Sequence, residues 1–297
     1  MNNPQYPIYI PSKGRFENCL TAKCFVKDGV DFKLVIEEQE YTEYASRFDE
    51  NRLLVLPFSN QGSVIPARNW IKEHATAAGY ERHWQFDDNI RIFFRRWKGR
   101  RIPVEAGTAI TVIEDFTNRY ENIAISGFNY RMFAPDSNKL PPFYLNCHVY
   151  SACLILNSLP FEWRGKYNED TDYCLQVLSH GWCTVLVNAF LVDKIATMKM
   201  KGGNKTELYD KTDGRLKMAR SLERLWPGVV ETKRRFGRPQ HVVKDAWKRF
   251  DTPLKLKAGI NLEDLPPVDD YGLKLKQVKE IQSEDLRRFV EDEIEDK

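Results

Sequence analysis

The sequence lacks the features that would place the chain in a membrane or send it out of the cell. None of its apolar runs approaches the ~20 residues needed to cross a bilayer. Its polar N-terminus does not resemble a signal peptide. Its six cysteines form no C-x-x-C pair and no spacing typical of a zinc site. We therefore expect a cytoplasmic protein with reduced thiols and no membrane partner.

A strong overall charge is missing as well. The net charge of the 297 residues is +3, which by itself does not indicate a nucleic-acid-binding protein. Basic residues nevertheless cluster at 91–101 and 233–238, and acidic residues gather at 291–296. A length of 297 residues is enough for one large α/β domain with an appendage, or for two modest domains, and the hydrophobic fraction of 42% suits a sizeable core.

Short apolar runs alternate with helical patterns over the first two hundred residues. Apolar runs that predict strands lie at 7–10, 32–36, 53–56, 83–86, 123–126, 149–156 and 183–187. Helical patterns lie at 66–78, 105–120 and 171–180. This alternation predicts an α/β fold with a mostly parallel central sheet flanked by helices. Polar loops follow the strands that end at residues 10, 36 and 86, and ligands bind at the carboxyl ends of the strands in such sheets.

The pattern changes after about residue 200. A charged amphipathic helix is predicted at 208–226, and a second helix at 283–294 lies among acidic runs that follow a Pro-Pro pair. We expect residues 1–205 to form the ligand-binding domain. Residues 206–297 are expected to form a helical, charged extension that is partly mobile.

The Asp87-Asp88-Asn89 turn follows the strand at 83–86. Carboxylates at the tip of a buried strand are costly unless they are paired. A divalent cation such as Mn²⁺ or Mg²⁺ takes carboxylate, amide and phosphate oxygens, so it would pair these groups with a nucleoside diphosphate. The alternative is an ordinary turn in which Asp and Asn cap the next segment.

A second acidic group, Glu169, Asp170 and Asp172, opens the helix at 171–180. Three carboxylates within four residues repel one another, which tends to raise at least one pKa. A carboxylate held in this way can act as a general base. The alternative is a helix N-terminus, where the helix dipole favours acidic residues.

Two weaker patterns involve groups that can approach a phosphate. Arg68 and Asn69 stand at the start of a predicted helix and can face a phosphate or a base. The Gly-Gly-Asn loop at 202–204 lets backbone come close to a ligand, and lysines flank it. Both patterns are equally compatible with an ordinary surface helix and loop.

The basic stretch at 91–101 interleaves cations with Phe93, Phe94 and Trp97. Cations neutralise phosphates and aromatic rings stack on bases, so the stretch is a candidate DNA contact, with these three rings available for stacking. The candidate DNA-binding residues are Arg95, Arg96, Trp97, Lys98, Arg100 and Arg101. The alternative is a solvated basic face over a few core aromatics.

The order of these pieces resembles the GT-A glycosyltransferases. A strand ending in Pro-Ser-Lys-Gly-Arg is followed by an acidic strand end, an Ala-Arg-Asn helix start, the Asp-Asp-Asn turn and a Glu-Asp-x-Asp helix start. The resemblance covers residues 6–205 and implies a GT-A, Rossmann-like domain that binds a nucleotide sugar and its acceptor. The nucleotide-sugar residues that it implies, together with the Gly-Gly-Asn loop, are Pro11, Ser12, Lys13, Arg15, Glu37, Arg68, Asn69, Asp87, Gly202, Gly203 and Asn204.

The same resemblance implies roles for the two acidic groups. The metal would be held by Asp87, Asp88 and Asn89, with Asn in place of the usual final Asp. Asp170 would be the base that activates the acceptor, with Glu169 the next candidate. A late histidine often completes the metal site in this family, and His241 is a weak candidate for it.

A narrower resemblance is to the phage TET-associated glycosyltransferases. The IYIPSKGR opening, the FDDNI turn, the NEDTD motif and the Gly-Gly-Asn loop are similar to theirs. This resemblance implies a metal-dependent hexosyltransferase, inverting in its stereochemistry. The donor would be a UDP-sugar and the acceptor 5-hydroxymethylcytosine in phage DNA, so DNA carrying a hydroxymethylated base is the expected partner. A base inside a duplex is inaccessible, so flipping or local opening is expected.

Two other functions fit parts of the pattern. A nucleotidyltransferase also uses paired acids and a metal on a similar sheet, but it would bind a nucleoside triphosphate and release pyrophosphate. A catalytically inactive nucleic-acid-binding module would bind DNA and no nucleotide sugar.

Overall fold

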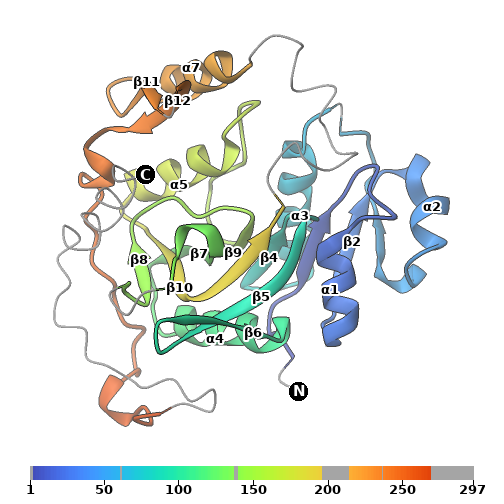
Figure 1. Cartoon of the computed structure of the whole chain (residues 1–297), viewed down its shortest axis with the longest axis horizontal. Helices are drawn as coiled ribbons and strands as arrows, with labels where there is room; N and C mark the ends of the chain where they lie inside the picture. Colours follow the sequence, from blue (N-terminus) through green and yellow to red (C-terminus); the bar gives the residue numbers. More distant parts are fainter. Residues whose placement is uncertain (1–2, 61, 137–139, 196–213, 236, 269–297) are drawn as a thin grey trace.

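The computed structural model describes residues 3–60, 62–136, 140–195, 214–235 and 237–268 (Figure 1). The strands of its large sheet are β1 (Ile8–Pro11), β2 (Lys33–Ile36), β3 (Leu53–Val55), β4 (Arg82–Phe86), β5 (Ile90–Trp97), β6 (Arg100–Val104), β7 (Ile123–Tyr130), β8 (Phe143–Leu145), β9 (Ala152–Leu156) and β10 (Cys183–Lys194). A separate hairpin consists of β11 (Val230–Arg235) and β12 (Arg238–Val243).

The helices surround this sheet (Figure 1). They are α1 (Leu20–Asp28), α2 (Tyr41–Ala45), α3 (Ile65–Ala77), α4 (Ala106–Asn118), α5 (Glu169–Ser179) and α7 (Arg215–Leu225). Short 3-10 turns lie at Glu38–Glu40, Glu50–Arg52, Arg131–Phe133, Lys244–Trp247 and Leu262–Asp264.

The strand order of the large sheet is β3-β2-β1-β4-β9-β7-β10-β5-β6, and β8 pairs with β10. The ladders among β1 to β4 are parallel, as is the ladder between β7 and β10. Only β9, β5 and β8 run against the others. Seven of the ten strands described in this sheet therefore share one direction, and the predicted α/β fold with a mostly parallel central sheet is confirmed.

Helices cover both faces of the sheet, which explains why β1, β4 and β9 are buried along their whole length. On β1, Ile8 and Ile10 point to the face covered by α1 and α4, whereas Tyr9 points to the face covered by α3. Helix α5 packs over β7, β9 and β10 on the α3 face. The polar residues that follow β1, β2 and β4, Ser12, Glu37 and Asp88, are buried at the carboxyl ends of these strands.

Several predicted elements differ in extent from the observed ones. Strands β7 and β10 continue to Tyr130 and Lys194, well beyond the apolar runs that predicted them. The basic stretch at 91–101 forms the β5–β6 hairpin. Phe93 and Phe94 are buried within it, so the expectation that either could stack on a base is wrong, whereas Trp97 is 45% exposed.

The C-terminal part folds back onto the first domain. Helix α7 packs on the β11–β12 hairpin, next to α5 (Figure 1). Residues 251–257 then run along the sheet, where the Asn122 side chain bonds to the carbonyl of Pro253 and Tyr120 bridges to Leu256.

Of the helix predicted at 208–226, the described residues contain α7, which spans Arg215–Leu225. The helix predicted at 283–294 and the Gly-Gly-Asn loop lie outside the described residues. No helix in the described part of the chain is both long and apolar enough to span a bilayer.

Candidate active site

The tip of β4 carries a carboxylate that two cations hold. Asp87 Oδ1 accepts from Arg68 Nη2 at 2.9 Å, and its Oδ2 accepts from Lys194 Nζ at 2.6 Å. Burial alone would raise the pKa of Asp87, but Lys194 and Arg68 reverse this effect and lower it. The same pairing raises the pKa of Lys194 despite the burial of its amine. Asp87 is therefore an ionised carboxylate whose negative charge is balanced by Arg68 and Lys194.

Asp88 points toward the loop after β1. Its Oδ2 accepts from Ser12 Oγ at 2.8 Å and its Oδ1 pairs with Arg15. Its backbone carbonyl accepts from the N–H of Leu20 at 2.8 Å, which ties the start of α1 to the turn. Burial raises the pKa of Asp88 in spite of Arg15. The two neighbouring carboxylates of the turn therefore bind different groups, Asp87 the cations Arg68 and Lys194, and Asp88 the loop after β1.

The predicted metal triad does not converge on one point. Asp87 and Asp88 have separate cationic partners, and Asn89 donates from its Nδ2 to the carbonyl of Ile195 at 3.3 Å. Its Oδ1 is buried without a hydrogen-bond partner. Among the described residues, no three His, Cys, Asp or Glu side chains are grouped to hold a metal ion. In this arrangement the triad does not fit a shared metal, because Asp87 would have to release Arg68 or Lys194.

The ends of β1 and β2 meet through an ion pair. Pro11 is the last residue of β1, and Lys13 Nζ in the loop after it lies 3.2 Å from Glu37 Oε1. Glu37 is 1% exposed and also accepts from the N–H of Asn60 and the hydroxyl of Ser59, both at 3.2 Å. Burial would raise its pKa, but hydrogen bonds from Gln39 and Lys13 lower it. The predicted nucleotide residues of these two strands are therefore adjacent.

Arg68 connects the turn after β4 to the start of α5. Its guanidinium is buried, donates to Gln85 Oε1 at 3.1 Å and stacks over the ring of Trp163, 4.7 Å from the centroid. Its Nε lies 4.0 Å from Glu169 Oε1. Asn69 has a different role, since its side chain donates to the carbonyl of Trp163 and accepts from its N–H. It therefore fixes the segment on which Arg68 stacks.

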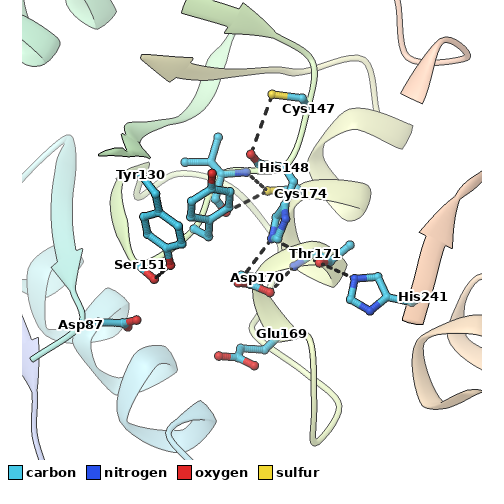
Figure 2. Close-up of polar contacts among 12 residues, drawn as sticks. Asp87, Tyr130, Cys147, His148, Ser151, Glu169, Asp170, Thr171, Cys174 and His241 are labelled. Carbon is cyan, nitrogen blue, oxygen red and sulfur yellow. Dashed lines mark hydrogen bonds and ion pairs between the residues drawn. The ribbon is translucent and has the colours of Figure 1, made fainter. Parts of the chain in front are cut away.

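Helix α5 begins at Glu169, after Asn168 adopts a left-handed conformation at φ 56°. The first turn thus contains Glu169 and Asp170, and Figure 2 shows Asp170 directed to His148, with Glu169 nearer to Asp87. Asp170 Oδ2 lies 3.3 Å from His148 Nε2, and its Oδ1 accepts from the N–H of Thr171 at 2.8 Å. Glu169 has Arg68 as its closest cationic partner among the described residues.

These two neighbouring carboxyl groups have opposite pKa shifts. Burial raises the pKa of Glu169, and the charge of Asp170 raises it further, with Arg68 opposing. Burial would raise the pKa of Asp170 too, but His148 and the N–H of Thr171 reverse the effect and bring it below its usual range. The pair therefore offers one carboxylate that stays ionised and one that binds a proton more readily.

Asp172, the last acid of the motif, is a structural group. Its buried carboxylate accepts from Arg164 Nε at 2.9 Å, Gln176 Nε2 at 2.8 Å and Trp226 Nε1 at 2.7 Å. Trp226 follows α7, so Asp172 joins the C-terminal part to α5.

Residues from distant parts of the chain complete the site without any sequence motif. Lys194 bonds to Ser151 Oγ at 2.7 Å and Tyr130 Oη at 3.2 Å, in addition to Asp87. His148 sits beside Asp170, as described above. The only local signal for Lys194 is its place at the end of a long apolar run. His148 follows no regular pattern, so its role depends on the fold alone.

The histidine considered for the metal site lies elsewhere. His241 comes from β12 and its Nε2 is 3.4 Å from Thr171 Oγ1, next to His148 (Figure 2). Burial and the neighbouring His148 lower the pKa of His241 to about 4, so it is neutral near pH 7. It borders the Asp170 side of the site.

The predicted DNA-binding residues extend away from this cluster. Ile90 at the start of β5 pairs with Lys194, and seven residues later Trp97 lies about 23 Å along the strand. Arg95 stacks over Trp97, Arg96 donates to the carbonyl of Leu140, and Arg101 pairs with Asp136 at 2.7 Å. Lys98 and Arg100 are exposed at the turn between the strands.

The fold defines an α/β protein with its polar site at the carboxyl ends of the strands. The sequence profile of the TET-Associated Glycosyltransferase family matches residues 6–203, and the chain belongs to this family. The family expected from the sequence motifs is thus confirmed, and the protein is a glycosyltransferase. The solved structure of the inositol-1-phosphate CTP transferase from T. maritima is similar to this chain with a TM-score of 0.38 and 9% identity, over 66% of this chain and 91% of that chain. No curated protein matches the sequence.

Proposed function

We propose that the protein transfers a sugar from a nucleoside diphosphate sugar, with a UDP-sugar as the expected donor, to the hydroxyl of 5-hydroxymethylcytosine in DNA. The observation that carries this proposal is the junction made by Arg68. It joins the paired cations and carboxylates at the strand ends to the Glu169–Asp170 pair. A phosphorylated donor and a proton acceptor can therefore meet there.

The donor side of the proposal rests on the cations around the turn after β4. Arg68, Lys194 and Arg15 lie at the carboxyl ends of the strands, and Lys13 is near them. Such groups neutralise a diphosphate and stabilise it as a leaving group. We assign the nucleotide to the loop after β1 and the end of β2, where Ser12 and Glu37 lie.

The acceptor side rests on the first turn of α5. The acceptor hydroxyl oxygen bonds to the anomeric carbon while the bond from that carbon to the diphosphate oxygen breaks. The hydroxyl proton passes to Asp170, and the nucleoside diphosphate leaves. Asp170 is the first choice because His148 and the N–H of Thr171 hold it ionised and oriented. Glu169, with its raised pKa, is the second candidate for the base that accepts the hydroxyl proton. Attack from the face opposite the leaving group would invert the anomeric carbon.

The family resemblance also implies a divalent cation, Mn²⁺ or Mg²⁺, which Asp87 could bind only by releasing Arg68 or Lys194, and chelation tests this expectation directly. If the cation is required, excess EDTA abolishes transfer and added Mn²⁺ restores it. If transfer is unchanged in EDTA, Arg68 and Lys194 are sufficient to neutralise the diphosphate.

Analysis of the released nucleotide separates this function from its two rivals. Transfer releases one nucleoside diphosphate per sugar, whereas a nucleotidyltransferase releases pyrophosphate from a nucleoside triphosphate. Calorimetry without DNA covers the other rival, because an inactive DNA-binding module binds no nucleotide sugar. Pyrophosphate release, or the absence of nucleotide-sugar binding across a donor panel, would overturn the proposal.

A further inference from the structure

The described C-terminal part is strongly basic, unlike the chain as a whole. Residues 214–250 contain eleven Lys and Arg against three Asp and Glu, whereas the excess over the full 297 residues is three. These residues form α7, the β11–β12 hairpin and the short turn after it, which we call the basic unit. So large a local excess of one sign attracts a polyanion.

One half of this charge lies on α7. Lys217, Arg220 and Arg224 recur at positions i, i+3 and i+7, so they lie on one face of the helix. Ala219 and Leu222 are buried on the opposite face. The three cations are all exposed and form a stripe directed to solvent.

The other half lies at the turn end of the hairpin. Arg234, Arg235 and Arg238 are exposed there, and Arg235 pairs directly with Arg238 across the strands. None of these three, nor the three cations of the α7 stripe, forms an ion pair with another residue in the described part of the chain. Their charge is therefore available to an external ligand.

The basic unit is fixed relative to Asp170. Trp226 Nε1 donates to Asp172 at 2.7 Å, and Asn168 Nδ2 donates to the carbonyl of Met218 on α7 at 2.9 Å. Asp172, which accepts the first bond, and Asn168, which donates the second, each lie two residues from Asp170. On β12, His241 borders the site, and Arg238 precedes it by three residues, about 10 Å along the strand.

We propose that the basic unit binds the phosphate backbone of DNA and holds the modified base next to Asp170. A flipped base stays bonded to its own backbone, so a phosphate-binding surface has to lie close to the group that reacts with the base. The basic unit meets this condition, whereas the exposed cations of the β5–β6 turn lie at the far end of their strand. The inference rests on the proposed function for the identity of the substrate, but DNA binding is measured without any transfer.

The first experiment measures binding of the full chain to an unmodified DNA duplex by fluorescence anisotropy over a range of salt concentrations. The variants are R234A/R235A/R238A and K217A/R220A/R224A, and the matched control is K23A/K27A/K33A, which removes three charges around α1 and β2. Each basic-unit variant is expected to weaken binding about 10- to 100-fold at low salt. It should also reduce the slope of log K against log salt by about 2 to 3, as expected when up to three phosphate contacts are lost. The control keeps the affinity and slope of the unsubstituted chain.

The second experiment compares transfer to hydroxymethylated DNA with transfer to the free hydroxymethylated nucleoside. The basic-unit variants raise the KM for DNA and leave turnover of the nucleoside unchanged. The proposal is overturned if they bind DNA like the control. Equal loss on the nucleoside also overturns it, because that result indicates a distorted site. If the unsubstituted chain transfers no sugar but the variants lose DNA affinity, the proposed function fails and the DNA surface stands.

Discussion

At the start of α5, the neighbouring charged and hydrogen-bonding groups determine the pKa values of two adjacent carboxyl groups. Glu169 and Asp170 occupy the same turn of one helix, yet among the described residues the histidine His148 lies beside Asp170 and not beside Glu169. In the described part of the chain, the cation that pairs with Glu169 is Arg68, at 4.0 Å, and Arg68 is shared with Asp87. The helix dipole acts on both residues, so it does not account for the difference.

The raised pKa of Glu169 has a consequence for stability. A carboxyl group whose pKa is higher in the folded state favours folding only at low pH, and it costs stability above the ordinary glutamate pKa of about 4.3. Glu169→Gln should therefore raise Tm at pH 7, and the gain should vanish below about pH 4. Thermal unfolding at both pH values measures this, with the exposed Glu43→Gln as a control that leaves Tm unchanged. A lower Tm at pH 7 would contradict the assigned shift.

His148 should control the ionisation of Asp170. It is the main group that lowers the pKa of that carboxyl, so its removal should raise the pKa. In the pH–rate profile of His148→Ala, the acid limb therefore moves to higher pH. His148→Gln keeps a hydrogen-bond donor without a positive charge, and it should give a smaller shift. An unmoved acid limb in both variants would exclude Asp170 as the group that titrates.

At the scale of elements, the sequence predicts those helices and strands whose formation depends on the local pattern of apolar and polar residues. The apolar runs of β1 and β4, the helix α3 and the acidic start of α5 follow from periodicity and capping, and all are present. Periodicity does not specify which strand lies beside which, so it did not predict that β9 would run antiparallel between β4 and β7. Local pattern does not mark Lys194 or His148 as site residues either, since strand order brings them to Asp87 and Asp170.

The packing of β7 against β9 depends on Gly127. A methyl group at this position would lie 2.2 Å from the carbonyl oxygen of Ala152 and 2.6 Å from Val149 Cγ1. One of these contacts is backbone, so the strand itself would have to shift. Gly127→Ala should lower the free energy of unfolding by about 1–3 kcal/mol, as overpacking does in a dense core. Urea denaturation measures this, and unchanged stability would mean that β7 and β9 separate easily.

The attachment of α7 to α5 depends on Asp172. Asp172→Asn keeps the volume but removes the charge that Arg164 and Trp226 bond to. Hydrogen bonds to charged groups are the stronger kind, so we expect a loss of about 2–3 kcal/mol in urea denaturation. Arg164→Ala is the milder comparison, because Arg164 is half-exposed and leaves the other bonds of Asp172 in place. Equal effects of the two substitutions would contradict a central role for the carboxylate.

At the scale of the whole molecule, the sheet gathers a site from segments that are far apart in the sequence. Residues 12–15, 87 and 194 lie at the carboxyl ends of β1, β4 and β10, and side-chain contacts bring residues 68, 148 and 169–170 to them. The C-terminal part then covers one side of this site with His241, and its residues 214–250 carry eleven Lys and Arg against three Asp and Glu. Membership of the TET-associated glycosyltransferase family agrees with such a site.

The most direct test is the mass of the acceptor base after reaction. DNA that contains 5-hydroxymethylcytosine is incubated with the protein and a panel of nucleotide sugars, digested to nucleosides and examined by mass spectrometry. We predict that the hydroxymethylated nucleoside gains the mass of one sugar with at least one donor. Asp170→Asn should reduce the rate about 100-fold or more, the contribution expected of a general base. An unchanged nucleoside with every donor, or undiminished transfer by Asp170→Asn, would contradict the account.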